Sequence, residues 1–345
     1  MKAAILEGPG RIVYQEVETP RPGPGEVLVR VKAVSICGSD LLRVFNGAAK
    51  TYPLILGHEC AGIVVEAGEG VAKEHVGRRV AVAPLLPCMQ CPACQRGIYS
   101  SCEQYSFIGS RQAGGFAEYV VAPLRNLIDL PEKLDFEVGA ILEPSTVALH
   151  ALERGEIAEG LRVAILGAGS IGLCAVQWAR IKKAGLIIST DVVDENLAAS
   201  KMLGAHLTLN ARQEDVVASA MAETGDGVDL ALEVSGSPEG LMQAVMMLRP
   251  RGIVVCVGNQ PPEAMLPASI IEHITRRENE LRGTWMSYSA PFPGHEWSDS
   301  VAAILRGDLH VQTMISHRFP LSAIEDVFQQ IHSHALIHRK IILIP

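Results

Sequence analysis

The sequence predicts an α/β protein with two domains, a mostly-β domain and a doubly wound parallel sheet inserted into it. The first observation is the length of 345 residues, which exceeds the ~250–300 residues at which one hydrophobic core stops growing. The second is a series of short strand patterns before Leu149, separated by Pro and Gly. The third is a change of rhythm after Leu149, where continuous apolar runs alternate with helical stretches. Such alternation is typical of a parallel sheet covered on both faces.

Each domain is predicted from particular runs. Strands of the mostly-β domain are expected at AAIL, VLVRVKAV and GIVVEAG, and those of the inserted domain at VAILGAGSIG, LIISTD, VDLALEVSG and GIVVCVGN. After Arg282 the pattern becomes irregular again, with TWMSYSAPFPGHEW, a helical segment and a closing strand, KIILIP. We therefore assign residues 1–148 and 283–345 to the mostly-β domain and 149–282 to a Rossmann-type domain.

Composition narrows the function classes. Acidic residues outnumber basic ones by 38 to 30, which argues against a nucleic-acid binder or a binder of anionic membranes. An anionic small substrate stays possible, because a local Arg cluster can override net charge. The N-terminus lacks the apolar run of a signal peptide, and the uncharged run from Val163 to Ala179 is short and broken by glycines. We expect a soluble, cytoplasmic protein without membrane or nucleic-acid partners.

A glycine-rich motif predicts a dinucleotide site. It follows the strand RVAIL and precedes the helical run IGLCAVQWARI. The first glycine allows a tight turn, the second allows close approach of a pyrophosphate, and the third lets helix and strand pack closely. The next strand ends in an acid about 20 residues further on, where a carboxylate binds the adenosine ribose. The candidate cofactor-binding residues are Gly167, Gly169, Ser170, Ile171, Gly172 and Asp191, with Val257 and Gly258 at the end of GIVVCVGN.

Asp191 favours NAD over NADP. Its carboxylate would repel the 2′-phosphate of NADP, and Val192 and Val193 supply no Arg to accept that phosphate. The alternative interpretation of the whole glycine motif is a glycine-rich turn that binds no dinucleotide.

Four cysteines predict a structural zinc site. Cys88, Cys91, Cys94 and Cys102 have the spacing C-x2-C-x2-C-x7-C, and four thiolates can fill a zinc tetrahedron with no position left for substrate. An iron–sulfur cluster, a disulfide pair and a nucleic-acid-binding zinc ribbon are the alternatives. The cytoplasmic compartment disfavours disulfides, and nothing near the loop is basic enough for a nucleic acid. The remaining Cys60, Cys174 and Cys256 lie in apolar contexts and are interpreted as core residues.

A second metal site is predicted from Cys37, the pair His58-Glu59, and Glu143. Each lies beside Gly or Pro at the end of an apolar run, and residues at strand ends can converge on one metal. The protease motif HExxH is excluded because position 62 is Gly62. A thiolate, an imidazole and a carboxylate leave a fourth position open, as catalytic zinc requires. Taken singly, Cys37 would more often be a core residue and His58 a structural hydrogen-bonding residue.

Through these motifs and several others, the whole chain resembles the zinc-containing medium-chain dehydrogenase superfamily. The shared motifs are GEVLVRV, CGSD, GHE-x-x-G, the four-cysteine loop, GGFAEY, EP-x-TV and GAGSIG with its acid. The resemblance implies a GroES-like, zinc-binding catalytic domain, an NAD-binding Rossmann domain, two zinc ions per chain, and a homodimer or homotetramer built through the nucleotide domains. It implies catalytic-zinc ligands at Cys37, His58 and Glu143, with Glu59 able to join them or hold a water. Simple alcohol dehydrogenases have a cysteine where Glu143 stands, so the resemblance is to the polyol-dehydrogenase branch.

The resemblance also implies a mechanism. Zinc acts as a Lewis acid on the substrate hydroxyl, and hydride passes to NAD. Ser39 is expected to take the hydroxyl proton, and Thr146 to pack against the nicotinamide. Relatives carry a His shortly after this Ser where this chain has Leu41-Leu42, so the relay is expected to use water, Glu59 or the cofactor ribose.

The substrate is expected to be a polyol or a polyol phosphate. The segments FIGSR, LLPC and TWMSYSAPFPGHEW resemble those of the galactitol-phosphate dehydrogenases of this branch, which oxidise galactitol 1-phosphate to tagatose 6-phosphate. A phosphate needs a cationic clamp, and the candidates are Arg43 and Arg111. Rival hypotheses are a sorbitol- or threonine-type dehydrogenase, and a non-catalytic NAD-binding zinc protein.

Overall fold

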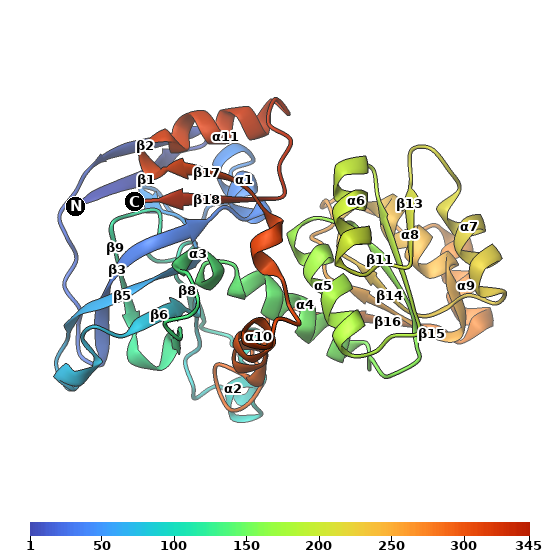
Figure 1. Cartoon of the computed structure of the whole chain (residues 1–345), viewed down its shortest axis with the longest axis horizontal. Helices are drawn as coiled ribbons and strands as arrows, with labels where there is room; N and C mark the ends of the chain where they lie inside the picture. The colour runs from blue at the N-terminus through green and yellow to red at the C-terminus, as the bar shows by residue number, and fades with distance from the viewer. The chain divides into compact units, whose positions relative to one another are not determined.

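The computed structural model describes all 345 residues and divides them into two compact units. The first unit comprises residues 1–143, 288–305 and 311–345, and the second comprises residues 144–287 and 306–310. The first unit is therefore discontinuous in sequence, with most of the second inserted into it (Figure 1). None of the helices is long and apolar enough to cross a membrane.

The first unit is mostly β. Its strands are β1 (Lys2–Gly8), β2 (Arg11–Glu16), β3 (Glu26–Ser35), β4 (Leu54–Ile55), β5 (Glu59–Ala67), β6 (Arg79–Val82), β7 (Leu85–Leu86), β8 (Ser106–Phe107), β9 (Tyr119–Pro123), β10 (Leu127–Asp129), β17 (Ile315–Pro320) and β18 (Lys340–Ile344). Its helices are α1 (Gly38–Phe45), α2 (Pro92–Gln95), α3 (Phe136–Gly139), α10 (His295–Arg306), which ends one residue into the second unit, and α11 (Ile324–His332). Short 3-10 turns are η1 (Lys73–His75), η2 (Tyr99–Ser101), η3 (Leu124–Asn126), η4 (Val311–Met314) and η5 (Leu321–Ala323).

The largest sheet of this unit positions the metal-site residues. Its strand order is β10-β6-β5-β3-β18-β17, and β9 also pairs with β3. Strand β3 lies between β5 and β18 and is antiparallel to both, with Ser35 opposite Glu59 on one side and Ile342 on the other. The end of β3 is therefore next to the start of β5 and the middle of β18. Apolar residues such as Val29, Val64 and Phe328 form the core on which this sheet rests.

The second unit is a doubly wound parallel sheet, as the sequence predicts. Its strands are β11 (Arg162–Leu166), β12 (Leu186–Asp191), β13 (Leu207–Asn210), β14 (Val228–Glu233), β15 (Leu248–Cys256) and β16 (Glu280–Gly283). Its helices are α4 (Leu142–Arg154), which begins two residues before the unit does, α5 (Ser170–Ile181), α6 (Asp194–Leu203), α7 (Val216–Thr224), α8 (Pro238–Met246) and α9 (Ala268–Arg277).

All pairings in this sheet are parallel, in the order β13-β12-β11-β14-β15-β16. The chain runs outward from β11 to β13, then returns and runs outward from β14 to β16 on the other side. Right-handed crossovers consequently place α5 and α6 on one face, and α8 and α9 on the other. The order reverses between β11 and β14, and ligands of such sheets bind at the carboxyl ends of the strands at that switch point.

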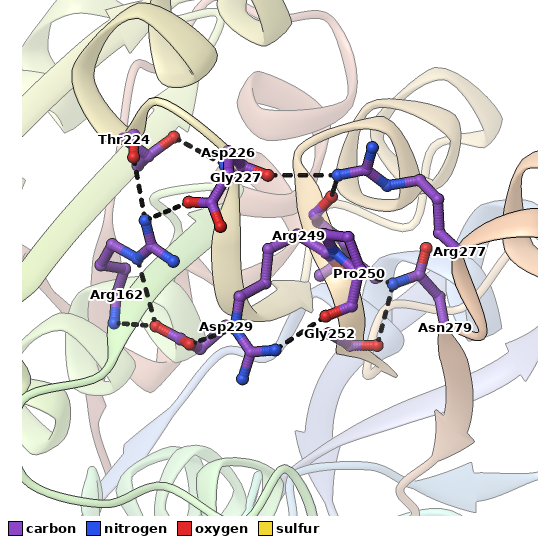
Figure 2. Close-up of polar contacts among 11 residues, drawn as sticks. Arg162, Thr224, Asp226, Gly227, Asp229, Arg249, Pro250, Gly252, Arg277 and Asn279 are labelled. Atoms are coloured by element: carbon purple, nitrogen blue, oxygen red, sulfur yellow. Dashed lines mark hydrogen bonds and ion pairs between the residues drawn. The ribbon is translucent and has the colours of Figure 1, made fainter.

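At the amino end of β11 and β14, a polar network fastens the strands (Figure 2). Asp229 accepts hydrogen bonds from the backbone N–H of Arg162 at 2.7 Å and from Nε of Arg249 at 2.5 Å. Arg277 donates to the carbonyl oxygens of Asp226 and Leu248. The network lies at the end of the sheet opposite the ligand-binding edge, so it is interpreted as structural.

Candidate active site and nucleotide site

The structure brings Cys37, His58 and Glu59 together. Cys37 follows β3 and is the N-cap of α1, and Glu59 is the first residue of β5. Pairing of β3 with β5 puts the end of β3 beside the start of β5. Their ligand atoms, one thiol sulfur, one ring nitrogen and one carboxylate oxygen, all lie within 4.8 Å of one another.

Asp40 contacts both Cys37 and His58 of this cluster. Its fully buried carboxylate accepts a hydrogen bond from the Cys37 backbone N–H at 3.1 Å and lies 3.4 Å from Nδ1 of His58. Burial lowers the pKa of His58, but the neighbouring Asp40 and Cys37 outweigh this and raise it well above its ordinary value. A carboxylate on one ring nitrogen orients a histidine whose other nitrogen binds a metal. Sequence reasoning overlooked Asp40, although it stands inside the quoted motif CGSD.

A buried lysine holds Glu59. Lys340, the first residue of β18, forms an ion pair with Oε2 of Glu59, and the Ser35 hydroxyl donates to the same oxygen. The Lys340 ammonium also donates to the Ile36 carbonyl at 3.3 Å. Both charged side chains are 1% exposed. Lys340 was not among the predicted site residues; the available signal was that it is the only charged residue of the apolar closing run KIILIP.

Glu143 is the other carboxyl group predicted for this site. It is at the start of α4 and is not among the donors within 4.8 Å of one another. It is nevertheless within electrostatic range, since burial, opposed by His58 and aided by Glu59, raises the pKa of Glu143 to about 7. Burial and the neighbouring Glu143 also raise the pKa of the Tyr288 hydroxyl.

The donor set fits a divalent cation. One thiol, one imidazole and two carboxyl groups are gathered in a buried region whose permanent positive charge comes from Lys340 and the half-buried Arg43. Buried carboxylates require a compensating charge, and zinc accepts these three kinds of ligand atom.

Ser39 and Arg43 lie four residues apart on α1 and therefore on one face of it. The Ser39 hydroxyl donates to Sγ of Cys37 at 3.3 Å. Nη1 of Arg43 donates to Ser39 Oγ at 2.7 Å and lies 3.4 Å from Asp40 Oδ1. The two contacts use one nitrogen of the guanidinium, which leaves Nε and Nη2 available to an anion.

Arg111, the other predicted clamp, is placed differently. Its guanidinium lies 3.8 Å from the centroid of the Tyr105 ring, and Nη1 donates to the Tyr105 carbonyl at 3.0 Å. None of these contacts joins it to Cys37 or Arg43.

The four cysteines form a second cluster. The sulfur atoms of Cys88, Cys91, Cys94 and Cys102 lie within 4.8 Å of one another, and all four thiols are free. The sulfurs of Cys88 and Cys94 are 4.0 Å apart, close to the ~3.8 Å edge of a tetrahedron with zinc–sulfur bonds of about 2.3 Å. Backbone N–H groups of Cys94 and Glu103 lower the pKa of Cys91 to about 6, which favours a thiolate. These features suggest a structural zinc site.

The glycine motif has the geometry of a phosphate-binding turn. A Cβ on Gly172 would lie 1.8 Å from the Gly167 carbonyl oxygen, and Gly167 has a φ of +104°. Gly169, in contrast, would meet nothing within 4 Å and has a φ of −74°. The first and third glycines are therefore required by the fold, whereas the second faces open space. Ser170 and Ile171 begin α5, whose N-terminal N–H groups favour an anion.

Asp191 is tied to this turn. Its Oδ2 accepts from the Ala168 N–H at 2.6 Å, and its Oδ1 accepts from the N–H groups of Val192 and Val193. Each carboxylate oxygen has more than one lone pair, so these bonds orient Asp191 and still permit a hydroxyl donor.

The other predicted cofactor residues have partners of their own. The buried hydroxyl of Thr146 lies 2.6 Å from that of Ser287. The N–H groups of Val257 and Gly258 both donate to the Glu233 carbonyl at 2.9 Å, so these two residues follow β15 and lie against the end of β14.

Two family models match the chain. "Alcohol dehydrogenase GroES-like domain" matches residues 23–132, and "Zinc-binding dehydrogenase" matches residues 170–305. Galactitol 1-phosphate 5-dehydrogenase of Escherichia coli K12 is 36% identical over 100% of both chains. Sorbitol dehydrogenase of Bacillus subtilis is 32% identical, covering 96% of this chain and 93% of that one.

Solved structures of dehydrogenases also match the whole chain. Galactitol-1-phosphate dehydrogenase from Escherichia coli matches with a TM-score of 0.95 and 36% identity over 100% of both chains. A zinc-binding dehydrogenase from Sinorhizobium meliloti 1021, bound to NADP, has a TM-score of 0.92 and 33% identity, covering 100% of this chain and 99% of that one. A protein described as a short chain alcohol dehydrogenase from Escherichia coli CFT073, complexed with NADH, has a TM-score of 0.91 and 29% identity with the same coverage. The predicted combination of GroES-like and Rossmann-type domains is confirmed.

Proposed function

Because this chain belongs to the zinc-binding alcohol dehydrogenase family, we propose that it oxidises a secondary hydroxyl of a polyol phosphate with NAD. The proposed reaction converts galactitol 1-phosphate and NAD⁺ to tagatose 6-phosphate, NADH and a proton. The observation that carries the proposal is full-length similarity to an enzyme named for that substrate. Residues 1–148 and 283–345 are proposed as the catalytic domain and 149–282 as the NAD-binding domain.

Two zinc ions are proposed per chain. Cys37 and His58 would hold the catalytic ion together with a carboxylate of Glu59 or Glu143, and the four clustered cysteines would hold the structural one. A catalytic zinc supplies a Lewis acid that lowers the pKa of a bound alcohol, and NAD supplies the hydride acceptor. Glu59 belongs to the cluster of three donors, although its Oε2 is engaged by Lys340 and Ser35.

Ser39 is proposed to receive the substrate's hydroxyl proton. The Arg43 guanidinium donates to Ser39 Oγ and fixes the direction of the hydroxyl. Arg43 cannot carry the proton further, because a guanidinium does not deprotonate in proteins. Glu59 is held by Lys340, so we assign the next step of the relay to water or the cofactor ribose.

Arg43 is proposed to bind the substrate phosphate. Its side chain is 19% exposed, and its Nε and Nη2 groups have the fork geometry that suits two oxygens of one phosphate. Its position four residues after Ser39 favours it over Arg111, which stacks on Tyr105.

NAD is proposed as the physiological cofactor. The carboxylate of Asp191 stands at the end of β12 beside the glycine turn, where it would accept from the ribose hydroxyls and repel a 2′-phosphate. Ser170, Ile171, Thr146, Val257 and Gly258 are proposed as further contacts with the dinucleotide.

A homodimer or homotetramer built through the Rossmann units is also proposed from the family resemblance. Strand β16 is the edge strand of its sheet, and Leu281 and Trp285 nearby are 45% and 50% exposed. Such an apolar edge favours pairing with a second copy. Light scattering of the purified protein measures the mass, and a monomer would contradict this part.

The test compares Arg43→Ala with Arg111→Ala. With NAD, Arg43→Ala is expected to lower kcat/KM for galactitol 1-phosphate about 100-fold, since the loss of a charge-assisted bidentate contact costs about two factors of ten. Because Arg43 also orients Ser39, the same substitution should lower kcat/KM for unphosphorylated galactitol as well, but by a clearly smaller factor, and Arg111→Ala should affect both substrates weakly. Equal losses for both substrates in Arg43→Ala would refute a phosphate clamp at this residue.

The second candidate is a sorbitol-type dehydrogenase, favoured by the Bacillus subtilis relative. Under that hypothesis sorbitol or galactitol is used as well as the phosphate ester. A zinc-binding protein without activity would show no NADH formation with any polyol.

A further inference from the structure

A buried carboxylate ends strand β14 at the ligand-binding edge of the parallel sheet. Glu233 is fully buried, and β14 is one of the two strands that flank the switch point of the strand order. Crevices at that point bind the ligands of doubly wound sheets. No step of the proposed reaction uses Glu233, and the sequence motifs do not include it.

Glu233 joins two loops. Its Oε1 accepts hydrogen bonds from Ser235 Oγ at 2.5 Å and from the Gly236 N–H at 2.9 Å, both in the loop after β14. Its Oε2 accepts from Nε2 of Gln260 at 2.9 Å, in the loop after β15. The N–H groups at the start of the β15 loop donate to its backbone carbonyl. Glu233 therefore holds the loop after β14 and the loop after β15 through its own hydrogen bonds.

The backbones of these two loops are in close contact with each other. A Cβ on Gly258 would lie 2.2 Å from the Gly236 nitrogen and 3.0 Å from Glu233 Oε2. A Cβ on Gly236, whose φ is +70°, would lie 2.7 Å from the Asn259 carbonyl oxygen. A displacement of the carboxylate would thus be transmitted directly to both loops.

The contacts continue to the glycine motif. The Ser235 N–H donates to the Leu166 carbonyl at 2.9 Å, and a Cβ on Gly167 would lie 2.8 Å from the Ser235 nitrogen. Ser235 therefore touches both Glu233 and the turn that approaches the pyrophosphate.

We propose that Glu233 is a positioning residue for the dinucleotide, which holds the loops after β14 and β15 in register with the glycine turn. The inference rests on the proposed NAD-binding function of this unit. Burial raises the pKa of Glu233 even though Ser235, Gly236 and Gln260 donate to it. An incompletely compensated buried carboxylate weakens the fold, which is expected where placement serves a ligand.

The test measures the Kd of NADH by fluorescence titration of the zinc-loaded Glu233→Gln variant. The amide keeps the size of the side chain but replaces one carboxylate oxygen with an N–H₂ group, which cannot accept from the donor of one of the two loops, so it weakens the link between them. The matched control is Asp229→Asn, at the opposite end of the same strand β14, where Arg162 and Arg249 donate to the carboxylate (Figure 2). Both substitutions replace a hydrogen-bonded carboxylate of the same strand with its isosteric amide, so they are matched in size and chemistry.

Glu233→Gln is expected to raise the Kd of NADH about tenfold, with kcat at saturating NAD changed less than KM for NAD. Asp229→Asn should leave the Kd within about twofold of wild type. A Kd in Glu233→Gln that matches that of Asp229→Asn would overturn the inference. Gln260→Ala, which removes only the link to the β15 loop, should raise the Kd about threefold; it decides the question if Glu233→Gln does not fold, and an unchanged Kd would then count against the inference. Wild-type protein that binds no NADH would instead refute the proposed cofactor, and this inference with it.

Discussion

Replacing Lys340 by Met tests the charge organisation beside the metal cluster. The substitution keeps most of the side chain's apolar volume and removes only the ammonium, which leaves Glu59 without its buried ion-pair partner. Breaking a fully buried pair from one side costs about 3–5 kcal/mol, because the remaining charge stays desolvated. For a compact unit of this size, 1 kcal/mol shifts Tm by about 2–4 °C, so we expect a fall of roughly 10 °C.

The control is Lys2→Met. Lys2 pairs with Glu16 at 3.6 Å, but the two side chains are 48% and 77% exposed. Exposed pairs contribute at most about 1 kcal/mol, so Tm should fall by no more than about 4 °C.

Thermal unfolding of both variants by calorimetry gives the comparison, and zinc content of the same samples separates lost stability from lost metal. Adding Glu59→Gln to Lys340→Met removes the unpaired charge and should recover a large part of the loss. A Tm for Lys340→Met that matches the Lys2→Met control would refute the reasoning.

Three further predictions concern the glycine turn, the pH dependence and the cysteine cluster. Gly169→Ala should keep wild-type Tm but weaken NADH binding at least tenfold, whereas Gly172→Ala should lower Tm because its Cβ meets the Gly167 carbonyl oxygen at 1.8 Å; equal Tm values would contradict the division of roles. At Asp229, burial raises the pKa, but hydrogen bonds and charges of Arg249 and Arg162 outweigh this, and the pKa lies below its ordinary value. The stability contributed by Asp229 is thus present above the unfolded pKa of about 3.9 and is lost as pH falls through the folded value. In urea unfolding at pH 7, the free energy of unfolding of the wild type should exceed that of Asp229→Asn by about 1–2 kcal/mol. This difference should disappear below about pH 4, and a difference that does not change with pH would contradict the reasoning. Finally, Cys88→Ser should lower bound zinc by about one ion per chain and lower Tm; unchanged metal content would exclude the proposed structural site.

Local sequence signals predicted much of the site. The four cysteines are close along the chain, and the glycine turn with Asp191 is contained in one β-α-β unit. Cys37 and His58 were predicted to converge because both follow apolar runs, and the pairing of β3 with β5 brings them together.

The remaining features depend on long-range pairing. Lys340 meets Glu59 only because β18 and β5 flank β3, and no local pattern specifies that arrangement. Glu233 likewise acquires its partner Gln260 only through the return of β15 beside β14. The structure also distinguishes the two carboxyl groups, since Glu59 is within the tight cluster and Glu143 is not. These distinctions require distances, which residue types do not supply.

The most direct test of the proposed activity is NADH formation by the wild-type enzyme with galactitol 1-phosphate and with galactitol. Recognition of the phosphate by a charge-assisted bidentate contact predicts a kcat/KM about 100-fold higher for the phosphate ester. Equal kcat/KM values for the two substrates, or activity with sorbitol that exceeds both, would contradict the account and favour an unphosphorylated polyol.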